Sequence, residues 1–163
     1  MGTIVVGVDG SPGSDAALRW ALDEARLRGS KLRVVHAYEE PQVPLSDVGL
    51  GAAGIPAPPV AGRDDVERLR ASAEEQARSV IESALRRVVG EGAERPEIER
   101  AARAGSAAQT LIDSGRDAEL LVLGSRGRGG FLGLLLGSVS QQCAHHPPCP
   151  VVILPPPEEA EST

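Results

Sequence analysis

The chain has 163 residues, a formal net charge of −6 at pH 7 and 41% hydrophobic residues, but only three aromatic residues. This length predicts one domain with a core built from Val, Leu, Ile and Ala side chains. The acidic balance argues against a protein that wraps nucleic acid, and no run approaches the roughly 20 apolar residues of a membrane span. Two cysteines give no disulfide framework and the first residues do not resemble a signal peptide, so we expect a cytoplasmic protein.

Strands and helices are expected to alternate along the chain. β-Branched apolar runs bounded by glycine or proline predict buried strands, and apolar residues at helical spacing predict the helices between them. Ser14 is expected to cap the first helix and Gly29 to end it. The expected elements are a strand at 3–8, a helix at 14–29, a strand at 31–37, a helix at 64–89, a strand at 97–103, a short helix after Ser106, a strand at 119–123, a helix from Ser138 and a strand at 150–154.

This alternation predicts an α/β fold, with an open, mostly parallel sheet that is covered by helices on both faces. The charges in 97–103 favour a position near a sheet edge, and the last strand, 150–154, is also expected at an edge. Residues 41–62 hold five prolines and four glycines without periodicity, which predicts an insertion or lid.

Two loops are expected to form a ligand site, because ligands of such sheets bind outside the carboxyl ends of the strands, where the strand order reverses. The first loop is Gly7–Ser11, and the second is the glycine-rich stretch Gly124–Ser138. Glycine amides can converge on an anion, and the helix that follows the second loop adds free N–H groups and a positive dipole end. The sequence therefore predicts a phosphate site. Further hydroxyl and guanidinium groups nearby belong to Ser138, Ser140, Arg126 and Arg128.

The glycine pattern is neither a P-loop nor a dinucleotide fingerprint. A P-loop needs a lysine before Ser or Thr, but Lys31 is the only lysine and lies in a predicted strand. The pattern Gly124-Ser-Arg-Gly127, nine residues and then Gly137-Ser138 instead resembles the nucleotide signature of the universal stress protein family. The stretches VVGVDGSPGSDAALRWA and CPVVIL are also similar to that family, so the resemblance covers nearly the whole chain.

The resemblance implies a doubly wound five-stranded sheet of order 3-2-1-4-5 that binds ATP in many family members, here expected with Mg²⁺. It implies a universal stress domain over residues 1–155, with 41–62 as a variable insertion, 156–163 as an acidic tail and a homodimer through strand 150–154. The residues expected at the nucleotide, the two arginines on their charge alone, are Gly7, Val8, Asp9, Ala37, Gly105, Gly124, Ser125, Arg126, Gly127, Arg128, Gly137, Ser138, Val139 and Ser140.

The preferred hypothesis for the function is a nucleotide-dependent stress-response regulator that acts on an unidentified protein partner rather than as an enzyme. A slow ATPase is the alternative, but no arranged acid–base pair is evident in the sequence. A phospho-accepting receiver domain is disfavoured because Asp9 has no acidic neighbours and Lys31 lies in the second strand. A family member that acts through protein contacts alone is disfavoured by the intact glycine spacing.

Several polar residues also have plain structural interpretations. Asp9 can stabilise the turn after the first strand, and His36 in an apolar strand is interpreted as a structural histidine. The cluster of Cys143, His145, His146 and Cys149 fits no standard zinc spacing, so no metal site is expected there.

Overall fold

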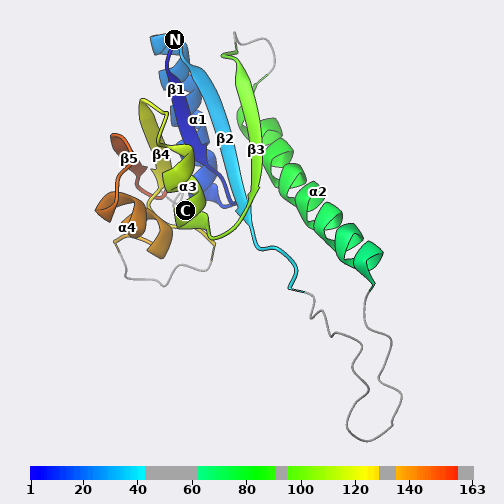
Figure 1. Cartoon of the computed structure of the whole chain (residues 1–163). Helices are drawn as coiled ribbons and strands as arrows, with labels where there is room; N and C mark the ends of the chain where they lie inside the picture. Colours follow the sequence, from blue (N-terminus) through cyan, green and yellow to red (C-terminus); the bar gives the residue numbers. More distant parts are fainter. Residues whose placement is uncertain (43–61, 91–94, 129–134, 158–163) are drawn as a thin grey trace, which may run out of the picture.

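The computed structural model describes residues 1–42, 62–90, 95–128 and 135–157 as an open sheet with helices on both faces (Figure 1). Its elements are β1 (Thr3–Gly7), α1 (Pro12–Arg28), β2 (Lys31–Tyr38), α2 (Arg63–Val88), β3 (Ile98–Ala104), α3 (Ala107–Ser114), β4 (Leu120–Gly124), α4 (Ser138–His145) and β5 (Val151–Leu154). The strand order is β3-β2-β1-β4-β5 and every pairing is parallel, which confirms the predicted fold and puts β3 and β5 at the edges. Because β2 and β4 flank β1, the strand order reverses at the carboxyl ends of β1 and β4.

Helix α1 begins earlier than its sequence predicts. Ser11 is the N-cap, and its Oγ accepts a hydrogen bond from the backbone N–H of Ser14 at 3.2 Å, so the prediction that Ser14 caps the helix is wrong. The reason is Pro12, whose missing N–H costs nothing in the first turn of a helix and whose fixed φ suits it. Gly29 ends α1 with a φ of 63°, in the left-handed region, as expected.

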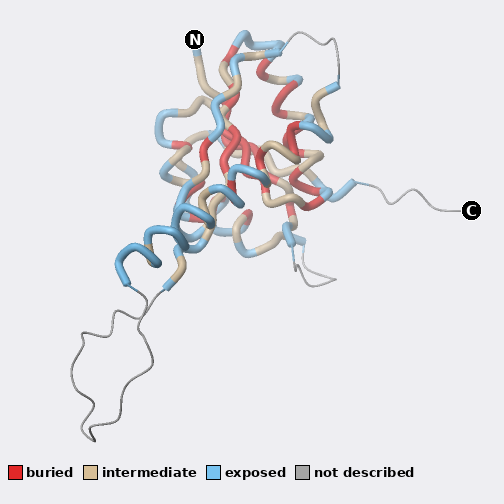
Figure 2. The backbone as a smooth tube through the Cα atoms, turned by 90° about the vertical axis from the view of Figure 1, so that its right-hand side faces the viewer, coloured by how far each residue is buried: buried red, intermediate tan, exposed pale blue. Residues whose placement is uncertain are grey.

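The buried residues gather in the middle of the molecule (Figure 2), and those of the described part form one cluster on each face of the sheet. Ile4 and Val6 of β1 point toward α1 and α2, where they belong to a cluster of fifteen buried residues. Val5 points the other way, into a cluster of seven buried residues beneath α3 and α4. This alternation follows from the pleat of the strand, in which successive side chains lie on opposite faces.

Helix α2 extends past the sheet that it covers. Its buried residues, Ala77, Ile81, Ala84 and Leu85, all lie in its second half. Residues 63–72 are exposed apart from Val66, and this part of the helix projects from the body of the molecule (Figure 2). No helix in the described part of the chain is long and apolar enough to cross a membrane. Most of the predicted insertion and of the acidic tail lies outside the described residues.

Candidate functional site

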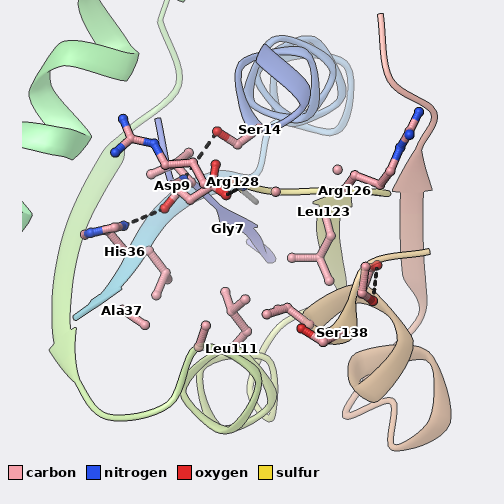
Figure 3. Close-up of a pocket in the computed structure, with 18 residues that line it drawn as sticks. Gly7, Asp9, Ser14, His36, Ala37, Leu111, Leu123, Arg126, Arg128 and Ser138 are labelled. Carbon is pink, nitrogen blue, oxygen red and sulfur yellow. Dashed lines mark hydrogen bonds between the residues drawn. The ribbon is translucent and has the colours of Figure 1, made fainter. Parts of the chain in front are cut away.

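A cavity of about 370 Å³ opens at the carboxyl ends of β1, β2 and β4, next to the first turns of α3 and α4 (Figure 3). It lies where the strand order reverses, as the sequence predicts. Most of the residues expected at the nucleotide line it. These are Gly7, Val8, Asp9, Ala37, Gly124, Arg126, Gly127, Arg128, Gly137, Ser138, Val139 and Ser140.

Two expected residues, Gly105 and Ser125, are not among those that line the cavity. Gly105 has a φ of 129° at the turn between β3 and α3, and its N–H donates to the carbonyl of Tyr38 at 2.9 Å. Ser125 is buried, and its N–H donates to the carbonyl of Leu154 at 2.7 Å. The backbone N–H groups of both residues are thus bonded to neighbouring strands, to β2 and to β5.

An apolar floor that the sequence analysis did not identify completes the cavity. Val35, Leu111 and Leu123 line it, and all three also belong to the smaller core cluster. Figure 3 shows the side chains of Leu111 and Leu123 directed into the cavity from α3 and β4. The other unpredicted lining residues are Ser14, His36 and Ala107. The floor offers an apolar surface to a flat ring, and the rim offers amides and hydroxyls.

Three glycines let the two loops of the cavity approach each other closely. A Cβ on Gly124 would stand 2.9 Å from the carbonyl carbon and oxygen of Gly13, and one on Gly13 would stand 2.8 Å from the carbonyl oxygen of Arg126. A Cβ on Gly127 would collide with Oδ2 of Asp9. The glycine-rich loop thus packs against the β1–α1 loop backbone to backbone, a contact that larger residues would prevent.

Asp9 connects these two loops through both of its carboxylate oxygens. Oδ1 accepts the backbone N–H of Ser11 at 2.9 Å, and Oδ2 accepts the backbone N–H of Arg128 at 2.9 Å. Burial would raise the pKa of Asp9, but hydrogen bonds from Ser11, from the Arg128 N–H and from Ser14 together lower that pKa below its usual value. Asp9 is therefore an ionised acceptor near neutral pH.

His36 has the structural role that its sequence suggests and also lines the cavity. Its Nδ1 is 2.7 Å from the carbonyl oxygen of Val8, which can only accept, so this nitrogen carries the proton. The N–H of Val8 donates to the carbonyl of Val35 at 2.9 Å. Both polar backbone atoms of Val8 are therefore fixed by β2.

The two arginines of the glycine-rich loop point in different directions (Figure 3). The side chain of Arg126 runs away from the cavity alongside β5. The side chain of Arg128 folds back over the β1–α1 loop, so that a Cβ on Gly10 would stand 2.8 Å from its Nη2. The side chains of Arg126 and Arg128 therefore do not face a phosphate together as expected. Of the two, only that of Arg128 lies at the opening of the cavity, beside Asp9.

The first turn of α4 borders the cavity, and the N–H groups at the start of a helix have no partner within the helix. Its N-cap is Gly137, which provides no side-chain cap, and Ser138, Val139 and Ser140 line the cavity. The hydroxyl of Ser140 donates to the carbonyls of Ser125 at 2.8 Å and Gly137 at 3.0 Å. Since a hydroxyl has one proton, Ser140 supplies no free donor to a ligand, which differs from the expectation, whereas Ser138 faces the cavity (Figure 3).

Within the described residues no three His, Cys, Asp or Glu side chains are grouped so that they could hold a metal ion. Cys143 is fully buried, and its Sγ lies 4.0 Å from the carbonyl oxygen of Ala108. Burial raises the pKa of the Cys143 thiol, so this residue behaves as a small apolar group between α3 and α4.

An open parallel sheet of this strand order, with a cavity at its switch point, defines a doubly wound α/β protein. The chain belongs to the universal stress protein family, whose profile matches residues 1–155. A universal stress protein of Mycobacterium tuberculosis is 35% identical over 151 residues, which cover 93% of this chain and 46% of that protein. The chain thus spans about half the length of the curated relatives it matches.

Solved structures show the same fold. A universal stress protein from Lactobacillus plantarum superposes with a TM-score of 0.69 at 18% identity, over 94% of this chain and 97% of that one. A universal stress protein solved in complex with cAMP is 27% identical, with a TM-score of 0.53, over 94% of this chain and 95% of that one.

Proposed function

We propose that the protein binds an adenine nucleotide, ATP with Mg²⁺, in the cavity at the carboxyl edge of the sheet. The observation that carries this proposal is the composition of the cavity wall, which combines an apolar floor with the backbone of Gly124, Gly127 and Gly137 and the N-terminus of α4. The base would lie on Val35, Leu111 and Leu123 and the phosphates at α4. The relative with bound cAMP supports an adenine ring in this fold.

The same proposal makes the protein a regulator rather than an enzyme. Asp9 is the carboxylate at the cavity, and it accepts two backbone N–H groups with a lowered pKa, which makes it a weak general base. We place this regulator in the cytoplasm, as a stress-response protein whose nucleotide state changes the surface that a protein partner meets. Slow ATP hydrolysis stays the alternative.

Two measurements test nucleotide binding. Mass spectrometry of small molecules released from the freshly purified protein should find an adenine nucleotide, and calorimetry with ATP and Mg²⁺ should show binding. Ala107→Glu puts a longer, charged side chain into the cavity wall in the first turn of α3, one turn before Leu111, where the helix dipole favours it. It should obstruct the base without unfolding the protein. Ala104→Glu is the matched control, because it adds the same charge outside the cavity lining. Equal ATP binding by both variants, or none by the unaltered protein, would refute the proposal.

We also propose a homodimer that forms through β5. This edge strand pairs with β4 on one side, and all four of its apolar residues are only half-buried, which suits pairing with a second copy. Ile153→Lys should convert a dimer into a monomer in analytical ultracentrifugation while the circular dichroism spectrum stays unchanged. Leu27→Lys, an exposed apolar position on α1, is the control and should stay dimeric. A monomeric unaltered protein would contradict this part of the proposal.

A further inference from the structure

The β1–α1 loop (residues 8–11) and the start of the glycine-rich loop (residues 124–128) contact each other at several positions. The backbone N–H of Arg128 donates to Oδ2 of Asp9, and the Arg128 guanidinium lies against Gly10 on the other side of the same loop. One turn further on, Gly13 meets the carbonyl oxygen of Arg126. All of these contacts join residues of the chain itself, so they hold two segments of the cavity wall together.

The carboxylate of Asp9 is the centre of this junction. Its two oxygens each accept one backbone N–H, one from its own loop and one from the glycine-rich loop, both at 2.9 Å. Its own N–H lies 3.3 Å from Oγ of Ser14, so the backbone of Asp9 is also held by α1. Gly127 lies so close that a Cβ there would collide with Oδ2 of Asp9. Asp9 is therefore bonded on both sides before any nucleotide contact is considered.

We propose that Asp9 is a positioning residue of the nucleotide site, which through Oδ2 fixes the backbone N–H of Arg128 and so holds the glycine-rich loop in its binding conformation. The inference rests on the proposed function, since the loop it positions is the one assigned to the ribose and phosphates. It differs from a contact role in one respect, because the loss on removing Asp9 arises in the free protein and does not depend on which groups the nucleotide carries.

The variant Asp9→Asn isolates this role. An amide has one acceptor oxygen and one donor NH₂, so Asn cannot accept the N–H groups of both Ser11 and Arg128, whichever way it is turned. Hydrogen bonds to a charged group are the stronger ones, so we expect ATP affinity to fall by roughly tenfold or more. The matched control is Asp113→Asn, which removes an exposed carboxylate that is hydrogen bonded to Gln109 and Arg116 outside the cavity, and it should leave the affinity unchanged.

Calorimetry with ATP and with its 2′,3′-dideoxy analogue separates positioning from direct contact. If Asp9 acts through the loop, Asp9→Asn weakens both ligands by the same factor. If the carboxylate instead binds the ribose hydroxyls, the loss seen with ATP disappears with the analogue, and that result would overturn the inference.

Hydrogen exchange of the ligand-free protein, followed by NMR, tests the junction itself. The amide of Arg128 should exchange faster in Asp9→Asn, while the amide of Ser125, which is bonded to Leu154, keeps its rate as an internal reference. An unchanged Arg128 rate would refute the inference even if ATP binding were lost. If the unaltered protein bound no nucleotide, the proposed function would fail, but this exchange result would still stand.

Two substitutions at Arg128 give an independent check. Arg128→Pro removes the N–H that Asp9 accepts, whereas Arg128→Ala removes the guanidinium and keeps the N–H. We expect Arg128→Pro to bind ATP more weakly than Arg128→Ala, because both lack the guanidinium and only the proline also lacks the N–H. Adding Asp9→Asn to Arg128→Pro should cause less than the sum of the two single losses, because both remove the same bond. Fully additive losses in the double variant, or an ATP affinity of Arg128→Pro no lower than that of Arg128→Ala, would contradict the proposed contact.

Discussion

The two faces of the sheet differ in what their side chains do. Among the described residues, the face under α1 and α2 has fifteen buried residues, from strands and helices alike, and only Val8 of these lines the cavity. In the same part of the chain, the face under α3 and α4 has seven buried residues, of which Val35, Leu111 and Leu123 also line the cavity. We therefore expect the face under α1 and α2 to contribute more to the free energy of unfolding. On the face under α3 and α4, part of the core also forms the proposed binding site.

The largest effect is expected from the α1 face. Leu18 is fully buried in the larger cluster, so Leu18→Ala should lower the free energy of unfolding by about 2–5 kcal/mol through lost burial and the cavity it leaves. Urea denaturation followed by Trp20 fluorescence measures the change. ATP affinity of the folded fraction should not move, because Leu18 is not among the cavity-lining residues. A large loss of ATP affinity without a loss of stability would contradict the conclusion that this face serves stability and the other face serves binding.

A smaller loss of stability is expected on the pocket face. Leu123 is 4% exposed but already borders an open cavity, so Leu123→Ala should cost about 2 kcal/mol, at the lower end of the range for such substitutions. Its main effect should be on ATP affinity, since the apolar floor loses a branched side chain. The same denaturation and calorimetry check both values. If Leu123→Ala destabilised the protein more than Leu18→Ala and bound ATP normally, the roles assigned to the two faces of the sheet would be wrong.

Acid provides a further contrast, because Asp9 lies on the pocket side with a lowered pKa. A carboxyl group with a lower pKa in the folded state stabilises the fold when it is ionised, and this contribution is lost as the pH falls below 3.8 through the folded pKa. Near pH 6 the unaltered protein should be more stable than Asp9→Asn by about 1.5 kcal/mol. The difference should shrink when unfolding is measured at successively lower pH. A difference that is constant down to pH 2 would show that ionisation of Asp9 is not involved.

Much of the fold follows from the sequence, since the β-branched runs, the Gly29 terminus and the charged edge strand β3 all appear where the patterns predict them. The backbone part of the cavity was also predictable, because glycine spacing is a property of the chain itself. The apolar floor was not. Leu111 and Leu123 have the same pattern as core residues, and only the packing of α3 against the sheet decides that their ends face a cavity.

Hydrogen-bond partners were the other part that the sequence could not predict. Ser140 has the position of a phosphate donor, but its proton is used by the carbonyls of Ser125 and Gly137. Arg126 has the charge of a phosphate ligand, but its side chain runs along β5 (Figure 3). Both outcomes depend on where separate segments meet, which residue type and spacing do not determine.

The smallest predicted effect concerns Arg33, which covers the amino-terminal half of the pocket face with ion pairs instead of apolar packing. Its guanidinium donates to Glu99 at 2.9 Å and to Asp117 at 2.8 Å, and its Nη1 also lies 3.2 Å from the carbonyl oxygen of Ser114. Both carboxylates are largely exposed, so water and salt screen these pairs, and Arg33→Met should lower the free energy of unfolding by only about 0.5 kcal/mol.

The methionine keeps the aliphatic cover over the strand while it removes the charge. The substitution therefore measures the contribution of the ion pairs separately from that of apolar packing. Raising the salt concentration should bring the two proteins closer in stability, because the Debye length falls to roughly 3 Å at 1 M. A loss as large as that in Leu18→Ala, or one that does not depend on salt, would mean that this polar cover contributes as much as a buried core and that the two faces are equivalent after all.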